Sequence, residues 1–338
     1  MIRAGLGPVQ MRFGVCLPIH GALPGGTPIE YLRKTLGMME ASTIESVWIE
    51  DHFRLPPNEI EASEGKTRVD EPLEAWTTLA AMAAISSRVR LGTEVTPMTI
   101  RHPGVLAKLA ANVDVLSRGR LILGAGAGWN RTEFVSQGIP FEPLEERFAK
   151  VKEALEVVKL LWTSDRVDFD GRFYRLRDAY LAPKPVSKPH PPIWLGGFSD
   201  RILALVAEFG DGWINATNAP PDDVEAERKR LVGMLEVRGR KLSEVFVAVP
   251  LMSIVRRKEE EAKKEAKQYM ERGKFDKTLR FFADTVNFGL VGTPAQCIEK
   301  IKRYSSAGVT HVIFDIRPPS NVLPTLELLC TEVVPAFA

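Results

Sequence analysis

The sequence predicts an α/β fold, a closed (β/α)₈ TIM barrel with insertions, and three observations support this. Short apolar runs rich in β-branched residues alternate with longer segments whose apolar residues recur at helical spacing. Strict strand–helix alternation is typical of parallel strands joined by right-handed crossovers. Eight such units favour a closed barrel, although periodicity alone leaves two doubly wound domains open. No low-complexity linker divides the 338 residues, so we expect one domain, 1–338.

Eight segments are expected to form the barrel strands, because each is short and apolar. They are 13–17, 46–50, 89–95, 120–124, 192–195, 212–215, 245–254 and 309–315. Two segments between them place large apolar residues on one helical face, which a sheet must cover. These residues are Val105, Leu106, Leu109, Val113 and Leu116 after Pro103, and Leu144, Phe148, Val151, Leu155, Val158 and Leu161 after Pro143.

Capping residues mark where two of the helices begin and end. Thr293-Pro294-Ala295-Gln296 has the pattern of a capping box with proline at the first helical position, and Gly308 is placed to end that helix. Ser199 is placed to cap the helix that follows strand 192–195, and Gly210 to end it. These boundaries agree with the strand–helix alternation.

Three stretches interrupt the alternation. The segment 163–191 contains 167–176, which reads as a hairpin turning at Asp170-Gly171, followed by five prolines that exclude a helix over 183–192. The segment 256–290 begins with a run of charges at 256–261 that we interpret as a solvated helix face. Residues 1–10 are expected to form a non-structural N-terminal extension.

The composition is that of an ordinary globular protein. Hydrophobic residues make up 45% and charged residues 26%, and 45 Lys and Arg against 43 Asp and Glu give a net charge of +2. These values exclude disordered and collagen-like classes, and they give no case for nucleic acid or an anionic membrane as partner. Three cysteines without a CxxC pair and histidines without HxxxH spacing predict no disulfide framework and no metal site. No apolar run approaches the roughly 18 residues of a membrane span, and no signal-peptide core is present, so we expect a cytoplasmic protein.

Candidate reacting groups follow from the barrel prediction, because such groups lie at the carboxyl ends of the strands. Strand 46–50 leads into Asp51-His52, an acid–histidine pair suited to proton transfer near neutral pH. Strand 89–95 carries Glu94 near the same rim. A loop cap at the first position and a kinked strand end at the second are the competing interpretations.

Glycines follow two further strands. Three alternate glycines over 124–128 would let the backbone approach a flat or phosphorylated ligand. Gly196 and Gly197 precede Ser199, and a strand, two glycines and a serine-capped helix can cradle a phosphate. A tight turn between strand and helix explains the second pattern equally well. The first pattern is not GxGxxG, so a Rossmann dinucleotide site is not expected.

Taken together, these motifs resemble the luciferase-like monooxygenase family, which includes the deazaflavin (coenzyme F420)-dependent oxidoreductases. The matching elements extend from Phe13 to near Phe337. They are Trp48-Ile49-Glu50-Asp51-His52, Leu91-Gly92-Thr93-Glu94-Val95-Thr96-Pro97, Arg118-Gly119-Arg120-Leu121-Ile122-Leu123-Gly124-Ala125-Gly126-Ala127-Gly128-Trp129, Asp170-Gly171-Arg172-Phe173-Tyr174, Pro192-Ile193-Trp194-Leu195-Gly196-Gly197 and Val291-Gly292-Thr293-Pro294.

The resemblance implies a barrel with a flavin or deazaflavin across its mouth. It implies a bulge behind the ring with a cis peptide between Glu94 and Val95, and a cofactor phosphate on the glycines after the fifth strand. It also implies that His52 faces the reactive ring edge with Asp51 beside it, as the catalytic residues. The expected cofactor contacts are Asp51, Thr93, Glu94, Val95, Gly126, Ala127, Gly128, Trp129, Asn130, Gly196, Gly197, Phe198 and Ser199.

The function implied by the resemblance is hydride transfer between coenzyme F420 and a small organic substrate. An FMN-dependent two-component monooxygenase, supplied by a separate flavin or F420 reductase, is the alternative, and a catalytically silent cofactor-binding barrel is the third. Trp129 stands where deazaflavin-dependent sugar-phosphate and alcohol dehydrogenases carry a glutamate, which argues against those oxidations. Family members commonly pair through barrel helices, so a homodimer is expected. Substrate specificity is expected from the segments 55–69 and 272–290.

Overall fold

The computed structural model describes residues 11–21, 23–55, 72–273 and 285–338. The expected extension 1–10 and most of the expected specificity segments 55–69 and 272–290 lie outside the described residues. Within the described ranges, no helix has both the length and the apolar character needed to cross a bilayer.

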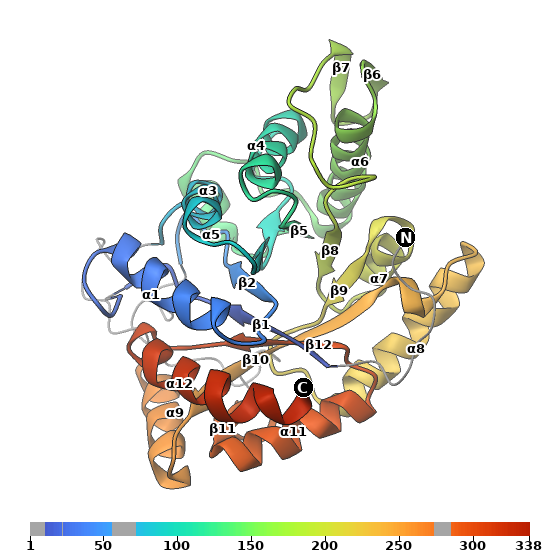
Figure 1. The fold of residues 1–338 in the computed structure, drawn as a ribbon. Helices are drawn as coiled ribbons and strands as arrows, with labels where there is room; N and C mark the ends of the chain where they lie inside the picture. The colour runs from blue at the N-terminus through green and yellow to red at the C-terminus, as the bar shows by residue number, and fades with distance from the viewer. Residues whose placement is uncertain (1–10, 22, 56–71, 274–284) are drawn as a thin grey trace.

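Eight parallel strands close into a barrel (Figure 1). In order around the ring they are β1 Arg12–Cys16, β2 Ser46–Ile49, β3 Arg90–Thr93, β5 Leu121–Gly126, β8 Ile193–Gly196, β9 Gly212–Ile214, β10 Phe246–Val255 and β12 His311–Asp315. Each pairs in parallel with the next, and β12 pairs with β1 over the register Arg12–His311 to Cys16–Asp315, which closes the ring. All eight predicted strands are confirmed, and the alternative of two doubly wound domains is wrong.

Helices surround the strands on the outside of the ring (Figure 1). The longer ones are α1 Pro28–Glu40, α3 Ala75–Ile85, α4 Pro103–Leu116, α6 Leu144–Thr163, α7 Asp200–Phe209, α8 Pro221–Val237, α9 Glu259–Gly273 and α11 Pro294–Ser306. The shorter ones are α5 Arg131–Ser136, α10 Thr285–Phe288 and α12 Val322–Leu328, with single turns at Leu242–Glu244, Pro319–Asn321, Leu329–Val333 and Val334–Phe337. Parallel strands need such crossovers, and the helices bury the outer face of the sheet.

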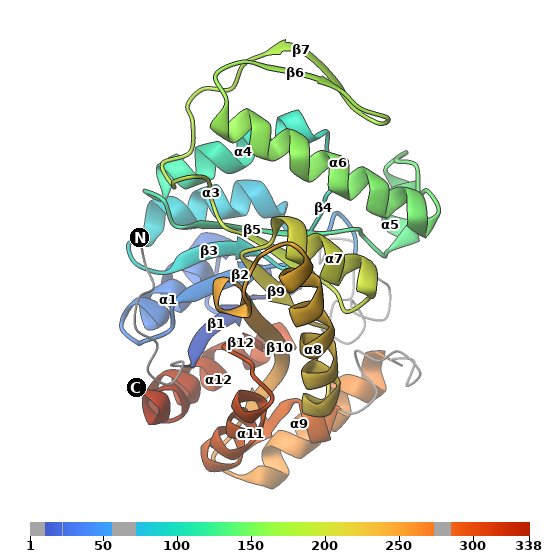
Figure 2. The ribbon, with the colours of Figure 1, turned by 90° about the vertical axis from the view of Figure 1, so that its right-hand side faces the viewer.

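Additional strands lie outside the regular order. The predicted hairpin is confirmed as β6 Val167–Asp170 and β7 Arg175–Ala179, which form a separate antiparallel sheet projecting beyond α4 and α6 (Figure 2). Short strands β4 Thr96–Pro97 and β11 Leu290–Gly292 pair with β5 and β10. The 256–261 segment leads into α9, whose first turn is acidic.

The predicted caps are confirmed. The Thr293 side chain and Gln296 form the reciprocal capping box of α11, and Gly308 follows that helix with φ 88°. The hydroxyl of Ser199 accepts from the backbone N–H of Ile202 at 3.4 Å, and α7 ends immediately before Gly210. Local sequence therefore sets the ends of these helices, because each cap satisfies backbone groups that have no partner within the helix.

The core has two layers, one inside the barrel and one between strands and helices. Inside, Trp48 and Trp194 pack with ring centroids 5.0 Å apart, so the barrel is filled with side chains and is not a pore. The outer layer corrects one expectation, since Val105, Leu116 and Leu144 are exposed. The buried face of α4 includes three alanines, Ala107, Ala110 and Ala111, and a pattern drawn from large apolar residues alone overlooks them.

Candidate active site at the barrel mouth

The closed parallel barrel brings the carboxyl ends of its strands to one rim. Glu50, Asp51 and His52 follow β2, and Glu94 follows β3. The glycines lie on the neighbouring strands β5 and β8 and just after them, while Asp315 ends β12 beside β1. The rim is therefore divided into a glycine-rich side and a side that carries ionisable groups.

His52 is held by an acid that the sequence analysis did not identify. Its Nδ1 lies 3.1 Å from Oε2 of Glu133, and the two side chains are 11% and 1% exposed. The other carboxylate oxygen of Glu133 accepts hydrogen bonds from the backbone N–H groups of Phe53 and Arg54. Because a carboxylate can only accept, this arrangement favours a proton on Nδ1 and leaves Nε2 as the nitrogen for proton exchange. The pattern Asn130 to Glu133 at a helix start is the sequence signal that could have indicated this acid.

Trp129 completes the surroundings of the imidazole. Its ring meets the His52 ring edge-on, with centroids 5.9 Å apart and an interplanar angle of 85°. The tryptophan is 62% exposed, which is unusual for so large an aromatic side chain at a rim lined by buried groups. An exposed aromatic face next to a half-buried histidine gives the rim an apolar surface that a flat ligand could contact.

Asp51 is engaged in a buried ion pair. Its carboxylate accepts two hydrogen bonds from Arg101, at 2.7 and 2.9 Å, and one from the Thr96 hydroxyl at 2.8 Å. Arg101 also binds Glu74 at 2.8 Å. A carboxylate with three donors is held in place, so this geometry assigns Asp51 to fixing the start of the loop that carries His52.

The glycines of the rim have close neighbours within the protein. A Cβ at Gly126 or Gly196 would lie 2.6 or 2.8 Å from a Val95 methyl group, so the Val95 side chain needs both glycines. A Cβ at Gly124 would lie 1.7 Å from the carbonyl oxygen of Thr93. Packing between strands thus accounts for these three residues, where the sequence analysis interpreted alternate glycines as room for a ligand. Gly197 differs, because its φ of +129° requires glycine at the turn into α7.

The other residues expected to contact the cofactor lie on or just after the same strands. The peptide between Glu94 and Val95 is cis, as the resemblance implies. The hydroxyl of Thr93 donates to the Gly124 carbonyl at 2.8 Å, and the Asn130 side chain caps α5 and donates to the Arg54 carbonyl. Ala127, Gly128, Phe198 and Ser199 lie on the loops after β5 and β8. The structure therefore brings the predicted residues to one rim, but several of their side chains already have protein partners.

Three carboxyl groups and one guanidinium lie together on the ionisable side. Arg317 binds Asp315 through Nε at 2.8 Å and Glu50 through Nη2. Although burial opposes it, the Arg317 charge lowers the pKa of Glu50. Burial raises the pKa of Glu94 well above its usual range, and the charges of Asp315 and Glu50 add to this. None of these residues except Glu94 was expected in the site, although the strand-end rule applies to the end of β12 as well.

His20 lies on the loop after β1 in the same region. It is buried, and neither of its ring nitrogens has a hydrogen-bond partner. Burial lowers the pKa of His20 to about 4, with Glu50, Arg317 and His52 as the charges that act on it. Buried polar atoms without partners are rare in native proteins and often mark a position that a ligand or water fills.

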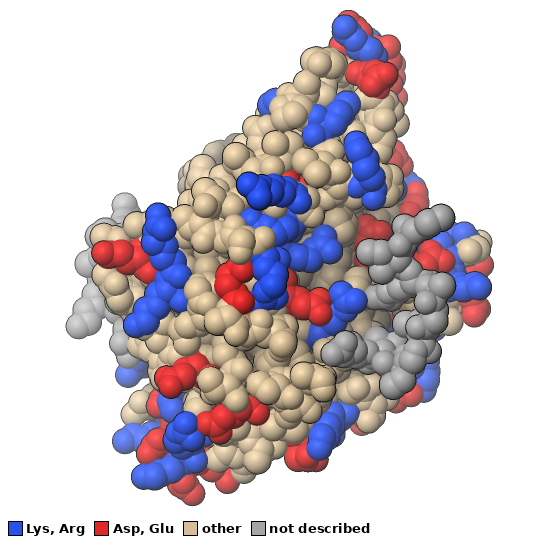
Figure 3. All heavy atoms as spheres, viewed as in Figure 1, with Lys and Arg blue, Asp and Glu red and all other residues tan. Residues whose placement is uncertain are grey.

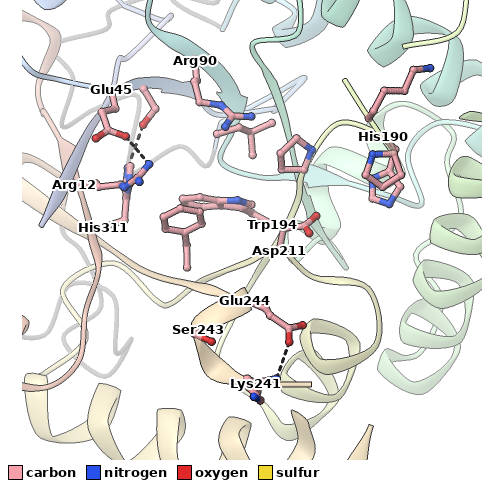
Figure 4. A pocket seen from close by; sticks show the side chains of 16 residues that line it. Arg12, Glu45, Arg90, His190, Trp194, Asp211, Lys241, Ser243, Glu244 and His311 are labelled. Carbon is pink, nitrogen blue, oxygen red and sulfur yellow. Dashed lines mark hydrogen bonds and ion pairs between the residues drawn. The ribbon is translucent and has the colours of Figure 1, made fainter. Parts of the chain in front are cut away.

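A cavity lies elsewhere in the barrel, away from this rim. It has a volume of about 780 Å³ and is lined by residues at the amino ends of the strands, including Arg12, Arg90 and His311 (Figure 4). Inside it Arg12 pairs with Glu45 at 3.0 Å. No predicted site residue lines it, and we place the candidate site at the opposite rim, because the reacting groups of such barrels lie at carboxyl ends.

On the face shown in Figure 3, cationic and acidic side chains are intermixed and form no continuous field of one sign. Within the described ranges, no group of three His, Cys, Asp or Glu side chains is arranged to hold a metal ion.

The residues of the rim fit a ring-shaped redox cofactor with a phosphate tail. His20 and the Glu94 Oε2 provide buried polar atoms without partners, and Trp129 provides an exposed aromatic face. α7 begins at Asp200, three residues after Gly197, and helix N-termini present N–H groups that bind phosphate.

Comparisons with known proteins agree with this geometry. A family profile described as luciferase-like monooxygenase matches residues 11–311. An F420-dependent glucose-6-phosphate dehydrogenase from Kineococcus radiotolerans is 35% identical over 176 residues, which are 52% of this chain and 49% of that protein. The chain thus spans about half the length of this curated relative.

Two solved structures resemble the whole barrel. An F420-dependent secondary alcohol dehydrogenase in complex with an F420–acetone adduct has a TM-score of 0.80 at 20% identity, covering 97% of this chain and 99% of that one. A monooxygenase from Streptomyces bottropensis has a TM-score of 0.78 at 22% identity, covering 97% and 100%. At such identities the likeness shows the fold alone, and the two proteins differ in their named chemistry.

Proposed function

This chain belongs to the luciferase-like monooxygenase family, and on that premise we propose that it is an F420-dependent oxidoreductase that exchanges a hydride with a small organic substrate. The observation that carries the proposal is the half-buried His52, oriented by Glu133 at the rim, with Trp129 against its ring. The names of curated relatives, such as the F420-dependent dehydrogenase above, support the deazaflavin over FMN.

The residues have separate tasks under this proposal. When bound, a deazaflavin supplies or accepts a hydride. The backbone of 126–128 and Val95 would support the ring, and Gly197 with the first turn of α7 would hold the phosphate. His52 would exchange the accompanying proton at Nε2, because Nδ1 faces Glu133. Asp51 and Arg101 would keep that loop in position.

A second candidate is a reduced-FMN-dependent monooxygenase. Trp129 favours it, because the resemblance places a glutamate there in the sugar-phosphate and alcohol dehydrogenases of the deazaflavin branch. An aromatic side chain cannot serve as the general acid that those oxidations use.

Cofactor titration tests the proposal. Purified protein is titrated with oxidised F420 and with reduced FMN, and we expect the deazaflavin to bind more tightly. The reverse order would overturn the proposal in favour of the monooxygenase. With a panel of aldehydes and ketones, reduced F420 should then be oxidised by the wild type and not by His52→Ala. A matched control is His190→Ala, which alters a histidine that lines the distant cavity. Tight binding without oxidation of any compound would indicate a silent barrel.

A further inference from the structure

Glu94 is a half-buried acid, and one of its carboxyl oxygens is fully buried. Its Oε2 has no hydrogen-bond partner, although it is shielded from solvent. The residue follows β3 directly, and the Cys16 thiol at the end of β1 is a hydrogen-bond partner of its carboxyl group. An ionised carboxylate in such a place would lack the donors that normally compensate its burial.

The carboxyl groups around Glu94 make its ionisation still less favourable. Glu50 at the end of β2 and Asp315 of β12 raise the pKa of Glu94 further, whereas the charge of Arg317 lowers it. The single guanidinium is already shared by Glu50 and Asp315. Like charges in one site raise the pKa of at least one of the three carboxyl groups. Burial raises the pKa of Asp315 as well, but Asp315 and Glu50 accept hydrogen bonds from Arg317. The Glu94 Oε2 has no hydrogen-bond partner among the described residues, so Glu94 is the group that keeps the proton.

We propose that Glu94 is a neutral carboxylic acid at neutral pH and that its O–H group donates a hydrogen bond to a carbonyl oxygen of the ligand in the barrel mouth. Enzymes use acids kept neutral by an apolar site in this way, since the O–H group is a strong donor without a charge. The inference rests on the proposed function only in placing a carbonyl-bearing ring or substrate there. Glu50 and Asp315 beside it disfavour a phosphate or carboxylate at this position.

The first experiment uses the cofactor-free protein. Infrared difference spectra between wild type and Glu94→Gln at neutral pH should show the loss of a protonated-carboxyl C=O band. Glu142→Gln is the matched control, because Glu142 also has a buried oxygen without a partner. Although burial opposes it, Lys150 lowers the pKa of Glu142, so Glu142 should be ionised at neutral pH. Glu142→Gln should therefore leave the protonated-carboxyl band unchanged. Absence of the band change in Glu94→Gln would overturn the proposal.

Denaturation at several pH values gives an independent readout. A carboxyl group whose pKa is higher in the folded than in the unfolded chain, where it is near 4.5, destabilises the fold as pH rises above that value. The Glu94→Gln variant should therefore become more stable relative to the wild type as pH rises. The ratio of their unfolding equilibrium constants should change by at most about tenfold per pH unit. A stability difference between Glu94→Gln and the wild type that does not change between pH 5 and 8 would contradict a protonated Glu94.

Ligand titration tests the hydrogen bond. The Glu94→Gln variant keeps an N–H donor at this position, whereas the Glu94→Leu variant has none. F420 should therefore bind Glu94→Gln as tightly as the wild type, and it should bind Glu94→Leu about threefold to tenfold more weakly. Equal binding to all three would overturn the hydrogen bond. If neither F420 nor FMN binds the wild type, the proposed function and the hydrogen bond both fail, while the infrared and denaturation results decide the protonation of Glu94 separately.

Discussion

The buried pair of Asp51 and Arg101 allows the role of Asp51 to be tested quantitatively. The two side chains are 1% and 10% exposed, and two hydrogen bonds of 2.7 and 2.9 Å join them. Asp51→Ala would leave the guanidinium with Glu74 as its remaining carboxylate partner, at 2.8 Å. We therefore expect Asp51→Ala to destabilise the fold.

The size of the effect follows from this geometry. Breaking a buried ion pair by removing one partner costs about 3–5 kcal/mol. The contact with Glu74 places Asp51→Ala near the lower limit, about 3 kcal/mol. With an unfolding entropy of about 2.1 cal/mol/K per residue, the 338 residues give about 0.7 kcal/mol/K. The melting temperature should therefore fall by about 4 °C.

A double-variant cycle measures the pair itself. Asp51→Ala, Arg101→Met and the double variant are compared by urea denaturation and by thermal unfolding. The double variant should be more stable than the sum of the single losses predicts, because it removes the unpaired charge. Additive losses of stability would refute the reasoning. A fall in melting temperature of less than 1 °C for Asp51→Ala, in place of the expected ~4 °C, would also refute it. If Asp51 acted chiefly in proton transfer, Asp51→Ala would reduce turnover and leave the melting temperature unchanged.

Three further substitutions test other parts of the structure. Glu133→Gln should destabilise the fold by about 1.5–3 kcal/mol and remove the preference for a proton on Nδ1 of His52. Long-range proton–nitrogen NMR spectra of this variant that still show the Nδ1–H tautomer would contradict the assignment. Gly196→Ala should cost about 1–3 kcal/mol, because its Cβ would lie 2.8 Å from a Val95 methyl, and Val95→Ala in the same chain should restore part of the loss in urea denaturation. Although burial opposes it, backbone N–H groups before β3 lower the pKa of Glu40 from 4.5 to about 2, so this group stabilises the fold above pH 4.5 and the contribution is lost as pH falls toward 2. Glu40→Gln should therefore lose stability less steeply than the wild type over this interval, and equal slopes in acid denaturation would count against the three hydrogen bonds.

The fold could be predicted because its signals are local. Each of the eight strand segments is a short apolar run, and caps such as Thr293 and Ser199 act within three residues. Once parallel strands close a ring, the geometry places residues at strand ends on one rim, which is why His52 and Glu94 could be selected. The exposure of Val105 and Leu116 was not predictable from large apolar residues, because buried alanines determine which face of α4 packs.

The partners of the site residues depend on the tertiary structure. Glu133 lies 81 residues from His52, and Arg101 lies 50 residues from Asp51. The pattern Asn130 to Glu133 marks a helix start, but no local pattern shows that Glu133 or Arg101 binds a site residue, because a charge becomes informative only when its burial and its neighbours are known.

The amino-acid sequence by itself determined the order of strands and helices and the ends of the strands at which polar groups gather, and its eight units favoured a closed ring. Those features follow from periodicity and from the chirality of parallel crossovers, which act over tens of residues. Only the tertiary structure decided that Glu133 orients the imidazole, that Arg101 forms an ion pair with Asp51, and that the Glu94 Oε2 has no hydrogen-bond partner among the described residues. The physical reason is that hydrogen bonds and desolvation act over a few ångströms in space, whatever the separation along the chain.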